Sequence, residues 1–593
     1  MAMHAREARE HPQAASGARR EMGSVFTALT FIEIRRSFVV SRTARLSHIA
    51  AALAMLAMLA TFATFATLTS CGGHASMVPS SMPNAASASS GSSGAPFDIA
   101  YRVGWSDPAQ HQYDIQLDVG NLAGDVVRLQ MPVWSPGRYA PFFFARNVTD
   151  FTVTSNGAPV RWDRENGSLW RIYRGGATSI TVRYRVFANT LSGTFSVLDT
   201  AHANWNGPSL FMYVVDHKPN PVRLHVTVPQ GWQIVNGDSH SGNQADYTFE
   251  NYDRLADTPT EVSPSLMLDT LRIDNRIYRA MIHHNGAAPN VLRRRFLDDL
   301  AKIVRYENTV FSPPPLEMYT FLFNIGFPGG DGMEHLYSTQ IIDRTPWSEG
   351  AAVLPGLSTA AHEYFHVWNM KRVRAAALGP FDYTHEIYQP SLWVGEGWTQ
   401  YYGMMALPRS GVEPADQIYS AASQLVRANL TAPGRKEVSA RMASFEAPFF
   451  DGATSGYAVN PAAFFSYYTK GAGIALYLDL FIREHTGNRK SLDDAFRLLR
   501  DRTWGAANAS YYLQGRGYTE DDVEHAVSDA AGVDMHAWFE RHVGGTEDMD
   551  YDEVLGPAGM TLDRGTWRVS PSPNATTEQV RIREGWVSGK TSP

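Results

Sequence analysis

Three residues near the middle of the chain have the types and spacing of a metal site. His362 and His366 are four positions apart in AHEYFHVWN, and Glu363 directly follows the first histidine. On a helix, residues four apart project from one face, so the two imidazoles can grip one ion. A carboxylate beside the first ligand can accept the proton of an attacking water molecule, as in the HExxH motif. The apolar neighbours of the histidines argue against a solvated surface helix.

A catalytic zinc ion needs a third protein ligand and an open position. Glu396, in LWVGEGWTQYY, follows His366 in an apolar, aromatic and helical context. Burying a carboxylate is costly unless it is paired or bound to metal, which favours Glu396 over Asp382 and Glu386. The alternative is an ordinary glutamate at a helix N-terminus. A site with two histidines, a glutamate and an open position favours Zn²⁺ over cobalt or manganese. We expect one zinc ion per chain.

Two further segments carry residues that could handle a peptide. GFPGGDGMEHLYS, residues 326–338, is predicted to be a Gly-rich turn that contains Gly332, Met333 and Glu334. A glutamate held near the metal could bind the free ammonium group of a substrate. Tyr468 precedes a Lys-Gly step that opens a long apolar helix, and its hydroxyl could stabilise an oxyanion. Each signal is weak alone, because Gly-rich loops and core tyrosines are common.

Together these motifs resemble the glycyl aminopeptidase family of zinc metallopeptidases. HEYFHVWNMKRVR, LWVGEGWTQYY, GGDGMEH and YYTKG match it, and MPVWSPGRYAPFFFARNV resembles its N-terminal domain. The resemblance covers about residues 96–560 and implies a thermolysin-like catalytic domain. The family commonly ends in a PDZ domain. Only 31 residues follow LGPAGMTL, so we expect that domain to be absent or vestigial.

The resemblance implies roles around the metal. His362, His366 and Glu396 match the zinc ligands of the family, and Glu363 matches its general base. Asn369, one turn beyond His366, is a candidate for a supporting contact to the ligands.

It also implies how a substrate is held. Glu334, with Gly332 and Met333 before it, matches the motif that recognises the N-terminus of the substrate. Tyr468 matches the tyrosine that stabilises the transition state, and Tyr467 is the less favoured neighbour.

These roles predict a zinc-dependent aminopeptidase that removes N-terminal residues from peptides with a free N-terminus. By family, those residues are Gly or Ala. One alternative is a zinc endopeptidase with the same ligands, which would cut blocked peptides as readily as free ones. Another is a catalytically silent peptide-binding lipoprotein.

The spacing of apolar and polar residues divides the chain into segments. Residues 96–265 alternate apolar and polar side chains between Gly, Pro, Asn and Asp breaks, which predicts an all-β, sandwich-like domain. Residues 266–548 are mainly of helical periodicity, with one short β stretch in YTFLFNIGF. Residues 549–593 show weak periodicity and are expected to form a tail. The expected fold class is therefore α+β and multidomain, with the β domain followed by a mainly helical, thermolysin-like zinc peptidase domain.

Charge and cysteine content exclude other classes. The formal net charge of -7 argues against a nucleic-acid partner, which calls for a basic patch. The single cysteine, Cys71, excludes an intrachain disulfide.

The N-terminal segment predicts export. Residues 1–70 combine an arginine-containing start with an uncharged apolar stretch, and the ending LTSC resembles a lipoprotein box. The resemblance implies cleavage before Cys71 and its acylation, which would attach the protein to a membrane. A plain signal anchor is the alternative. Residues 71–95, rich in Ser, Ala and Gly, are a predicted flexible tether.

We therefore expect an exported lipoprotein of the bacterial cell envelope. Gly72 after the cysteine resembles the class that reaches the outer membrane, facing the periplasm. The sequence leaves the oligomeric state open.

Overall fold

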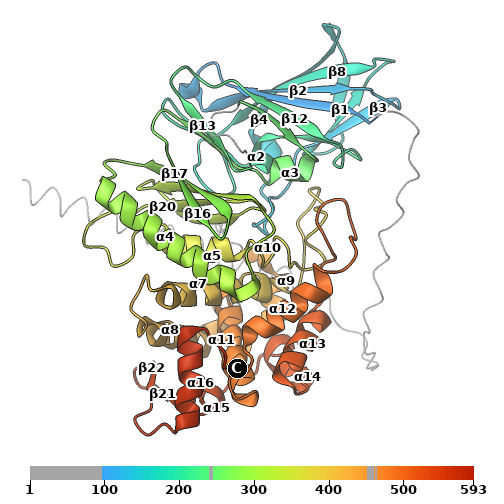
Figure 1. Cartoon of the computed structure of the whole chain (residues 1–593). Helices are drawn as coiled ribbons and strands as arrows, with labels where there is room; N and C mark the ends of the chain where they lie inside the picture. The colour runs from blue at the N-terminus through green and yellow to red at the C-terminus, as the bar shows by residue number, and fades with distance from the viewer. Residues whose placement is uncertain (1–95, 239–244, 451–459, 461, 463, 593) are drawn as a thin grey trace, which may run out of the picture. The chain divides into compact units, whose positions relative to one another are not determined.

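The computed structural model describes residues 96–238, 245–450, 460, 462 and 464–592. The predicted export signal, Cys71 and the tether lie outside these residues. Of the helices in the described part, none combines the length and apolar character that crossing a bilayer requires. Strands dominate the first part and helices the rest (Figure 1), which confirms the predicted fold class.

Three sheets build the β domain. The seven-stranded sheet has the order β14 (Asp246–Phe249), β12 (Val222–Val226), β1 (Asp98–Gly104), β2 (Gln112–Gly120), β8 (Ser179–Phe187), β4 (Val148–Ser155), β5 (Ala158–Pro159). One four-stranded sheet has the order β11 (Tyr213–Val214), β3 (Val126–Gln130), β7 (Leu169–Tyr173), β6 (Arg161–Arg164). The other has the order β13 (Gln233–Asn236), β15 (Thr260–Ser263), β10 (Ala203–Trp205), β9 (Val197–Leu198).

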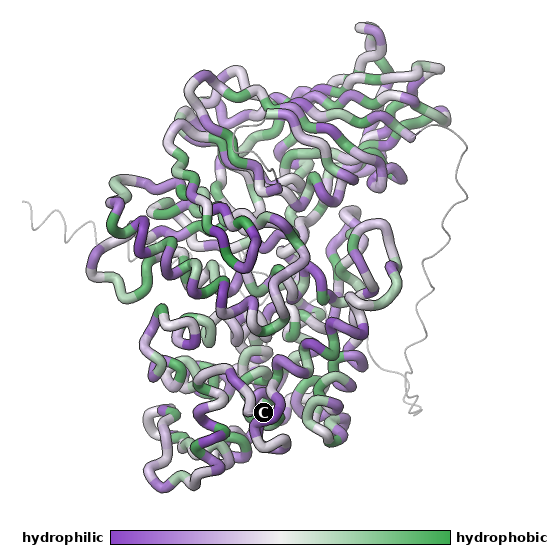
Figure 2. The backbone as a smooth tube through the Cα atoms, in the orientation of Figure 1, coloured by the Kyte–Doolittle hydropathy of each residue, from purple (hydrophilic) through white to green (hydrophobic). Residues whose placement is uncertain are grey.

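Side-chain alternation explains why these strands form. Along β2, Tyr113, Ile115, Leu117 and Val119 are buried, whereas the residues between them are partly exposed. Successive strand residues point to opposite faces, so one face of the sheet enters the core. The strands show this alternation as a change of hydropathy from residue to residue (Figure 2).

A five-stranded sheet opens the second part of the chain. Its order is β16 (Met267–Ile273), β17 (Arg276–His284), β18 (Met318–Ile325), β20 (Ser338–Asp343), β19 (Gly330–Glu334). β18 pairs in parallel with β17 and β20, and every residue of β18 is buried. A strand buried on both faces reads as a continuous apolar run, which is why this strand alone was predicted.

The structure corrects the prediction for the Gly-rich segment. Residues 330–334 form the edge strand β19, antiparallel to β20, rather than a turn. Five residues with two glycines carry little strand propensity of their own. Residues 330–334 are held in a strand conformation by pairing with β20, which is a tertiary contact.

Helices make up most of the second part of the chain, as its helical periodicity predicts. They are α4 (Asn290–Phe311), α5 (Leu357–Phe365), α6 (Leu392–Gly395), α7 (Gly397–Ser410), α8 (Gln417–Thr431), α9 (Ala440–Phe445), α10 (Ala447–Phe450), α11 (Tyr467–His485), α12 (Leu492–Thr503), α13 (Glu520–Ala531) and α14 (His536–Phe539). The short helices α9, α10 and α14 lie outside the periodic segments. α13 begins with a reciprocal capping box between Thr519 and Asp522.

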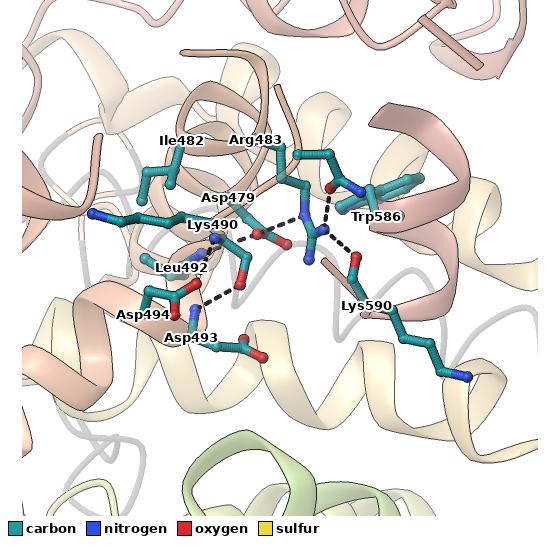
Figure 3. Close-up of polar contacts among 12 residues, drawn as sticks. Asp479, Ile482, Arg483, Lys490, Leu492, Asp493, Asp494, Trp586 and Lys590 are labelled. Atoms are coloured by element: carbon teal, nitrogen blue, oxygen red, sulfur yellow. Dashed lines mark hydrogen bonds and ion pairs between the residues drawn. The ribbon is translucent and has the colours of Figure 1, made fainter. Parts of the chain in front are cut away.

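The expected C-terminal tail is instead folded onto the helices. It contains α15 (Asp552–Leu555), the hairpin β21 (Met560–Asp563) and β22 (Arg568–Pro571), and α16 (Thr577–Ser588). Arg483 of α11 donates to the Lys590 carbonyl oxygen at 2.8 Å and pairs with Asp479 (Figure 3). Trp586 is fully buried. The tail was missed because its anchors are single side chains rather than an apolar stripe.

Candidate active site

Three potential ligand atoms converge between α5 and α7. The Nε2 atoms of His362 and His366 are 3.1 Å apart. Oε2 of Glu396 lies 3.5 Å from the first and 3.3 Å from the second. His366 and Glu396 are the cap residues at the end of α5 and the start of α7, so two helix ends position the group.

These separations fit a tetrahedral zinc ion. With ligand bonds of about 2.0–2.1 Å, neighbouring ligand atoms of a tetrahedron lie about 3.3 Å apart. The residues present therefore match Zn²⁺ in both donor type and spacing, and they could hold one ion.

The hydrogen bond at one ring nitrogen of His366 indicates which of its nitrogens could bind a metal. Its Nδ1 lies 2.9 Å from the carbonyl oxygen of Asn369, a contact in which the ring N–H donates. In the neutral ring, Nε2 is therefore the nitrogen that is free to bind a metal, and it faces His362 and Glu396.

Electrostatics at the group favour a bound cation. Burial alone would raise the pKa of Glu396, but His366 and His362 outweigh it and hold the pKa well below its usual range. Burial also works to lower the pKa of His366, but the Glu396 carboxylate raises it to about 9. Burial lowers the pKa of His362. A buried carboxylate anion thus faces two imidazoles.

Asn369 supports two of the three ligands. Its carbonyl accepts from His366, and its side-chain amide donates to the carbonyls of Val394 and Gly395 at 2.9 and 3.1 Å. The same amide contacts Thr399 Oγ1 at 3.0 Å. The residue therefore holds the His366 ring and fixes the backbone that leads into Glu396.

Glu363, the expected base, lies against the edge strand. A Cβ atom on Gly332 would lie only 2.0 Å from its Oε1, so only glycine fits beside this carboxylate. Burial, with Glu334 and Glu396 nearby, raises the pKa of Glu363 despite the opposing effect of His366.

Glu334 and Tyr468 lie near this group. Glu334 is buried on β19, and its carboxylate lies within 4.8 Å of ligand atoms of Glu363 and His366. The rings of Tyr468 and His362 are 6.0 Å apart. Tyr468 lines the cleft, whereas Tyr467 is buried and its ring is 6.1 Å from that of Tyr139. Met333, between Gly332 and Glu334, is fully buried.

A cleft of about 670 Å³ opens beside these residues. Its walls include His362 and Glu363 from α5, Tyr468 from α11, and polar residues of α7 and α8 such as Gln400 and Gln424. A peptide could therefore reach the metal group, which is the set of candidate ligands His362, His366 and Glu396, from this side.

The β domain contributes residues that sequence reasoning missed. The hydroxyl of Tyr139 donates to Glu396 Oε1 at 2.5 Å, so the β domain holds the carboxylate oxygen that does not face the histidines. Arg138, beside it, lines the cleft and pairs with Asp331 of β19. Both lie in SPGRYAP, part of the segment that resembles the family's N-terminal domain, but no local pattern indicates a role for either residue.

A second histidine–glutamate group is hydrogen-bonded differently. His202 Nε2 lies 2.5 Å from Glu261 Oε2, too close for two ligands of one ion, and His283 is beside them. The other Glu261 oxygen accepts from Asn204 and Asn324 at 3.1 and 2.6 Å. These bonds satisfy the carboxylate, so we interpret this group as a buried polar network.

Two family models match the chain. The Peptidase M61 N-terminal domain matches residues 100–264, and M61 glycyl aminopeptidase matches residues 356–474. The chain carries both domains of the M61 glycyl aminopeptidase family. This confirms the family that the sequence motifs indicated. The second match contains the three ligands, Glu363 and Tyr468.

A solved structure with a TM-score above 0.5 shows a similar fold. The crystal structure of an aminopeptidase N family protein from Idiomarina loihiensis is 25% identical, with a TM-score of 0.71 over 78% of this chain and 79% of that chain. Native yeast LTA4 hydrolase is 12% identical, with a TM-score of 0.43 over 78% of this chain and 70% of that one. No curated protein matches the chain. The M61 family and the first of these structures support a peptidase.

Proposed function

We propose that the protein is a zinc-dependent aminopeptidase that removes N-terminal Gly or Ala from peptides. The observation that carries this proposal is the group of three ligand atoms 3.1–3.5 Å apart, with Glu363 and Glu334 beside it. When bound, the zinc ion would act as a Lewis acid on a carbonyl group and lower the pKa of water.

The chain's own residues supply the remaining chemistry. Glu363, adjacent to the cleft, accepts a proton from the attacking water and delivers it to the leaving amine. Tyr468 donates a hydrogen bond to the oxyanion that develops. Glu334 binds the ammonium group of the substrate. The Glu334 carboxylate lies close to the metal group. An ammonium group bound there would therefore place the first peptide bond of the substrate at the metal, and a single N-terminal residue would be released.

The test compares free and blocked substrates. Purified protein starting near residue 96 is given Gly- and Ala-p-nitroanilide beside their N-acetylated forms, with and without a chelator. We expect cleavage of the free-amine substrates only, and its loss with chelator. Glu363→Gln should lower kcat about 100-fold or more, because general-base catalysis is lost.

The Glu334→Gln variant distinguishes an exopeptidase from the alternative functions. It removes the charge that pairs with the ammonium group, so kcat/KM for free-amine substrates should fall about 10- to 100-fold. Glu349→Gln, an exposed glutamate, is the matched control. Equal cleavage of acetylated substrates would make the protein an endopeptidase. Bound zinc without any turnover would favour the peptide-binding lipoprotein.

We also propose that Cys71 is acylated and attaches the protein to the cell envelope, most simply at the outer membrane. The support is the lipoprotein-like LTSC ending and the tether that follows. Full-length protein should incorporate labelled palmitate and sediment with membranes, and Cys71→Ser should do neither. Equal labelling of both would overturn the assignment.

A further inference from the structure

The turn that follows Glu334 is held by side chains of both domains. Glu334 is the last residue of β19, and residues 335–337 connect this strand to β20. The His335 N–H donates to the Ser338 carbonyl oxygen at 2.9 Å, which closes the turn. The position of Glu334 therefore depends on the backbone of this turn as well as on the strand.

One carboxylate of the β domain binds the turn directly. Asp257 is the C-cap residue of the short helix α3 (Tyr252–Ala256), and it is buried. Its Oδ2 accepts the backbone N–H of Leu336 at 2.8 Å, and its Oδ1 lies 3.2 Å from Nδ1 of His335. Both contacts are made within two positions of Glu334.

The same carboxylate reaches the segment that follows the HExxH motif. Lys371 Nζ donates to Asp257 Oδ1 at 2.8 Å, and the Lys371 N–H donates to the carbonyl oxygen of His366 at 3.2 Å. Burial alone would raise the pKa of Asp257, but Lys371 and His335 outweigh burial and hold that pKa below its usual range. The Asp257 anion therefore connects the turn after Glu334 to the backbone beside a candidate metal ligand.

α3 contacts the turn through a second side chain. The Arg254 guanidinium lies over the Tyr337 ring, 3.5 Å from its centroid, and Arg372 lies 5.7 Å from the same centroid. Arg254 Nε also donates to Asp238 at 3.0 Å, which fixes the direction of the guanidinium. A cation over an aromatic face is attracted to it, so Arg254 holds Tyr337 in the turn.

These contacts are needed because Glu334 lies near other carboxylates. Ligand atoms of Glu334, Glu363 and His366 lie within 4.8 Å of one another, and Glu396 is 3.3 Å from His366. Like charges repel more strongly where water is excluded. β19 pairs with β20 along one edge only, so contacts beyond the strand help to resist this repulsion at its end.

We infer that Asp257 and Arg254 are positioning residues that hold Glu334 where it binds the ammonium group of a substrate. This inference rests on the proposed aminopeptidase activity. The two side chains contact the turn rather than the metal group, so they act through residues 335–337. The β domain thereby contributes to the requirement for a free N-terminus.

The experiment measures how much of the affinity for a small ligand depends on an ammonium group. Glycine hydroxamate and acetohydroxamate both bind zinc through the hydroxamate, but only the first carries an ammonium group. The Kd of each is measured by calorimetry with the zinc-loaded full-length protein, and zinc content is measured before and after. The ratio of the two Kd values is the amine preference, and it does not depend on turnover.

Three variants weaken the contacts to the turn. Asp257→Asn removes the charge and keeps the size of the side chain. Asp257→Asn/Lys371→Met also removes the cation that would otherwise be left buried and unpaired, which is the costly outcome for folding. Arg254→Gln removes the cation from the Tyr337 ring.

Asp253→Asn is the matched control. Asp253 is on the same helix and is fully buried, but it accepts from Tyr511 and pairs with Lys218 instead of contacting the turn. A loss of amine preference caused by disturbing α3 in general would therefore appear in this variant too.

We expect wild type and Asp253→Asn to show the same amine preference and Glu334→Gln to lose it. Both Asp257 variants should lower the preference about 5- to 50-fold, as expected for coupled residues. Arg254→Gln should lower it about twofold or more. In the Glu334→Gln background, Asp257→Asn should change the ratio no further, because it acts through Glu334.

The outcomes separate this inference from the proposed function. If wild type binds both hydroxamates equally and Glu334→Gln changes nothing, the proposed ammonium site fails and the inference with it. A preference that Glu334→Gln abolishes, but that every folded turn variant keeps in full, would overturn the inference alone. Loss of zinc, or equal weakening of both ligands at an unchanged ratio, would show a general structural role and would also overturn it.

Discussion

Asn369 connects His366 and Glu396, two candidate metal ligands at the ends of different helices. Its carbonyl orients His366, and its amide holds the turn that ends in Glu396. Such supporting contacts commonly change metal affinity by 10- to 100-fold when they are removed. At the scale of a single residue, the site is therefore a connected set of hydrogen bonds behind the three ligands.

We predict that Asn369→Ala lowers zinc affinity about 10- to 100-fold, because Val394 and Gly395 lose their shared donor. The measurement is zinc competition with a chromogenic chelator, followed by zinc content after dialysis. Asn121→Ala, at an exposed loop residue, is the control. Unchanged affinity in Asn369→Ala would show that the backbone contact to His366 is sufficient.

Residues within the local motifs could be predicted from the sequence, whereas residues brought in by tertiary contacts could not. The spacing of His362 and His366 is itself the geometry of one helix face. Tyr139 is equally close to the metal group, at 2.5 Å from Glu396, but it is separated by more than two hundred positions and has no local pattern. Only the assembled domains bring it there.

At the scale of elements, α7 is the helix that joins the parts of the site. Its Gly397 contacts Gly471 of α11, and a Cβ atom on Gly397 would lie 2.4 Å from the Gly471 Cα. Its Gly403 contacts α5, because a Cβ atom on Gly403 would lie 3.0 Å from the His362 Cα. Glycines let helix backbones approach closely, so α7 sets the distance between His362, Glu396 and Tyr468.

We predict that Gly471→Ala destabilises the protein by about 1–3 kcal/mol, the usual cost of overpacking. The new methyl group would lie 2.1 Å from the Trp393 carbonyl, so α11 must move away from α6 and α7. Tyr468, on the first turn of α11, should move with it and kcat should fall.

Urea unfolding and steady-state kinetics check both effects of Gly471→Ala. Gly350→Ala, where a Cβ atom meets nothing within 4 Å, is the control and should change neither quantity. A stable Gly471→Ala variant with full activity would show that the two helices can shift without cost.

The long periodic helices were predictable because their apolar spacing is set locally, as in α4 and α11. The five-stranded sheet was largely missed, because β16, β19 and β20 depend on partners distant in the sequence. β-propensity reports chiefly how well a residue fits beside neighbouring strands. The edge strand that carries Glu334 could therefore be placed only once the sheet was known.

At the scale of the whole molecule, His283 lies in a polar network where the two domains meet. It extends from β17 toward β15 of the β domain, and its Nδ1 contacts Asn324 Oδ1 at 3.2 Å. Burial, followed by the neighbouring His202, lowers the pKa of His283 from 6.5 to about 4. Glu261, Asp199 and the Asn324 bond oppose this effect.

We predict an acid-sensitive domain junction. Because the folded-state pKa of His283 lies below the unfolded value, its stabilising effect is complete above pH 6.5 and is lost as the pH falls through 4. The difference corresponds to about 3 kcal/mol. Between pH 7 and pH 4, wild type should therefore lose about that much more free energy of unfolding than His283→Gln. Parallel losses in both proteins would contradict the assignment.

The folded C-terminal segment has a consequence for biosynthesis. The Trp586 indole N–H donates to Tyr401 of α7 at 3.0 Å, and Arg409 at the end of that helix donates to the Trp586 carbonyl at 2.7 Å. A ribosome adding about 5–20 residues per second reaches Trp586 roughly ten to forty seconds after α7 has been made. During that interval α7 lacks its buried support, so a nascent chain carries the candidate site residues before it can hold them in place.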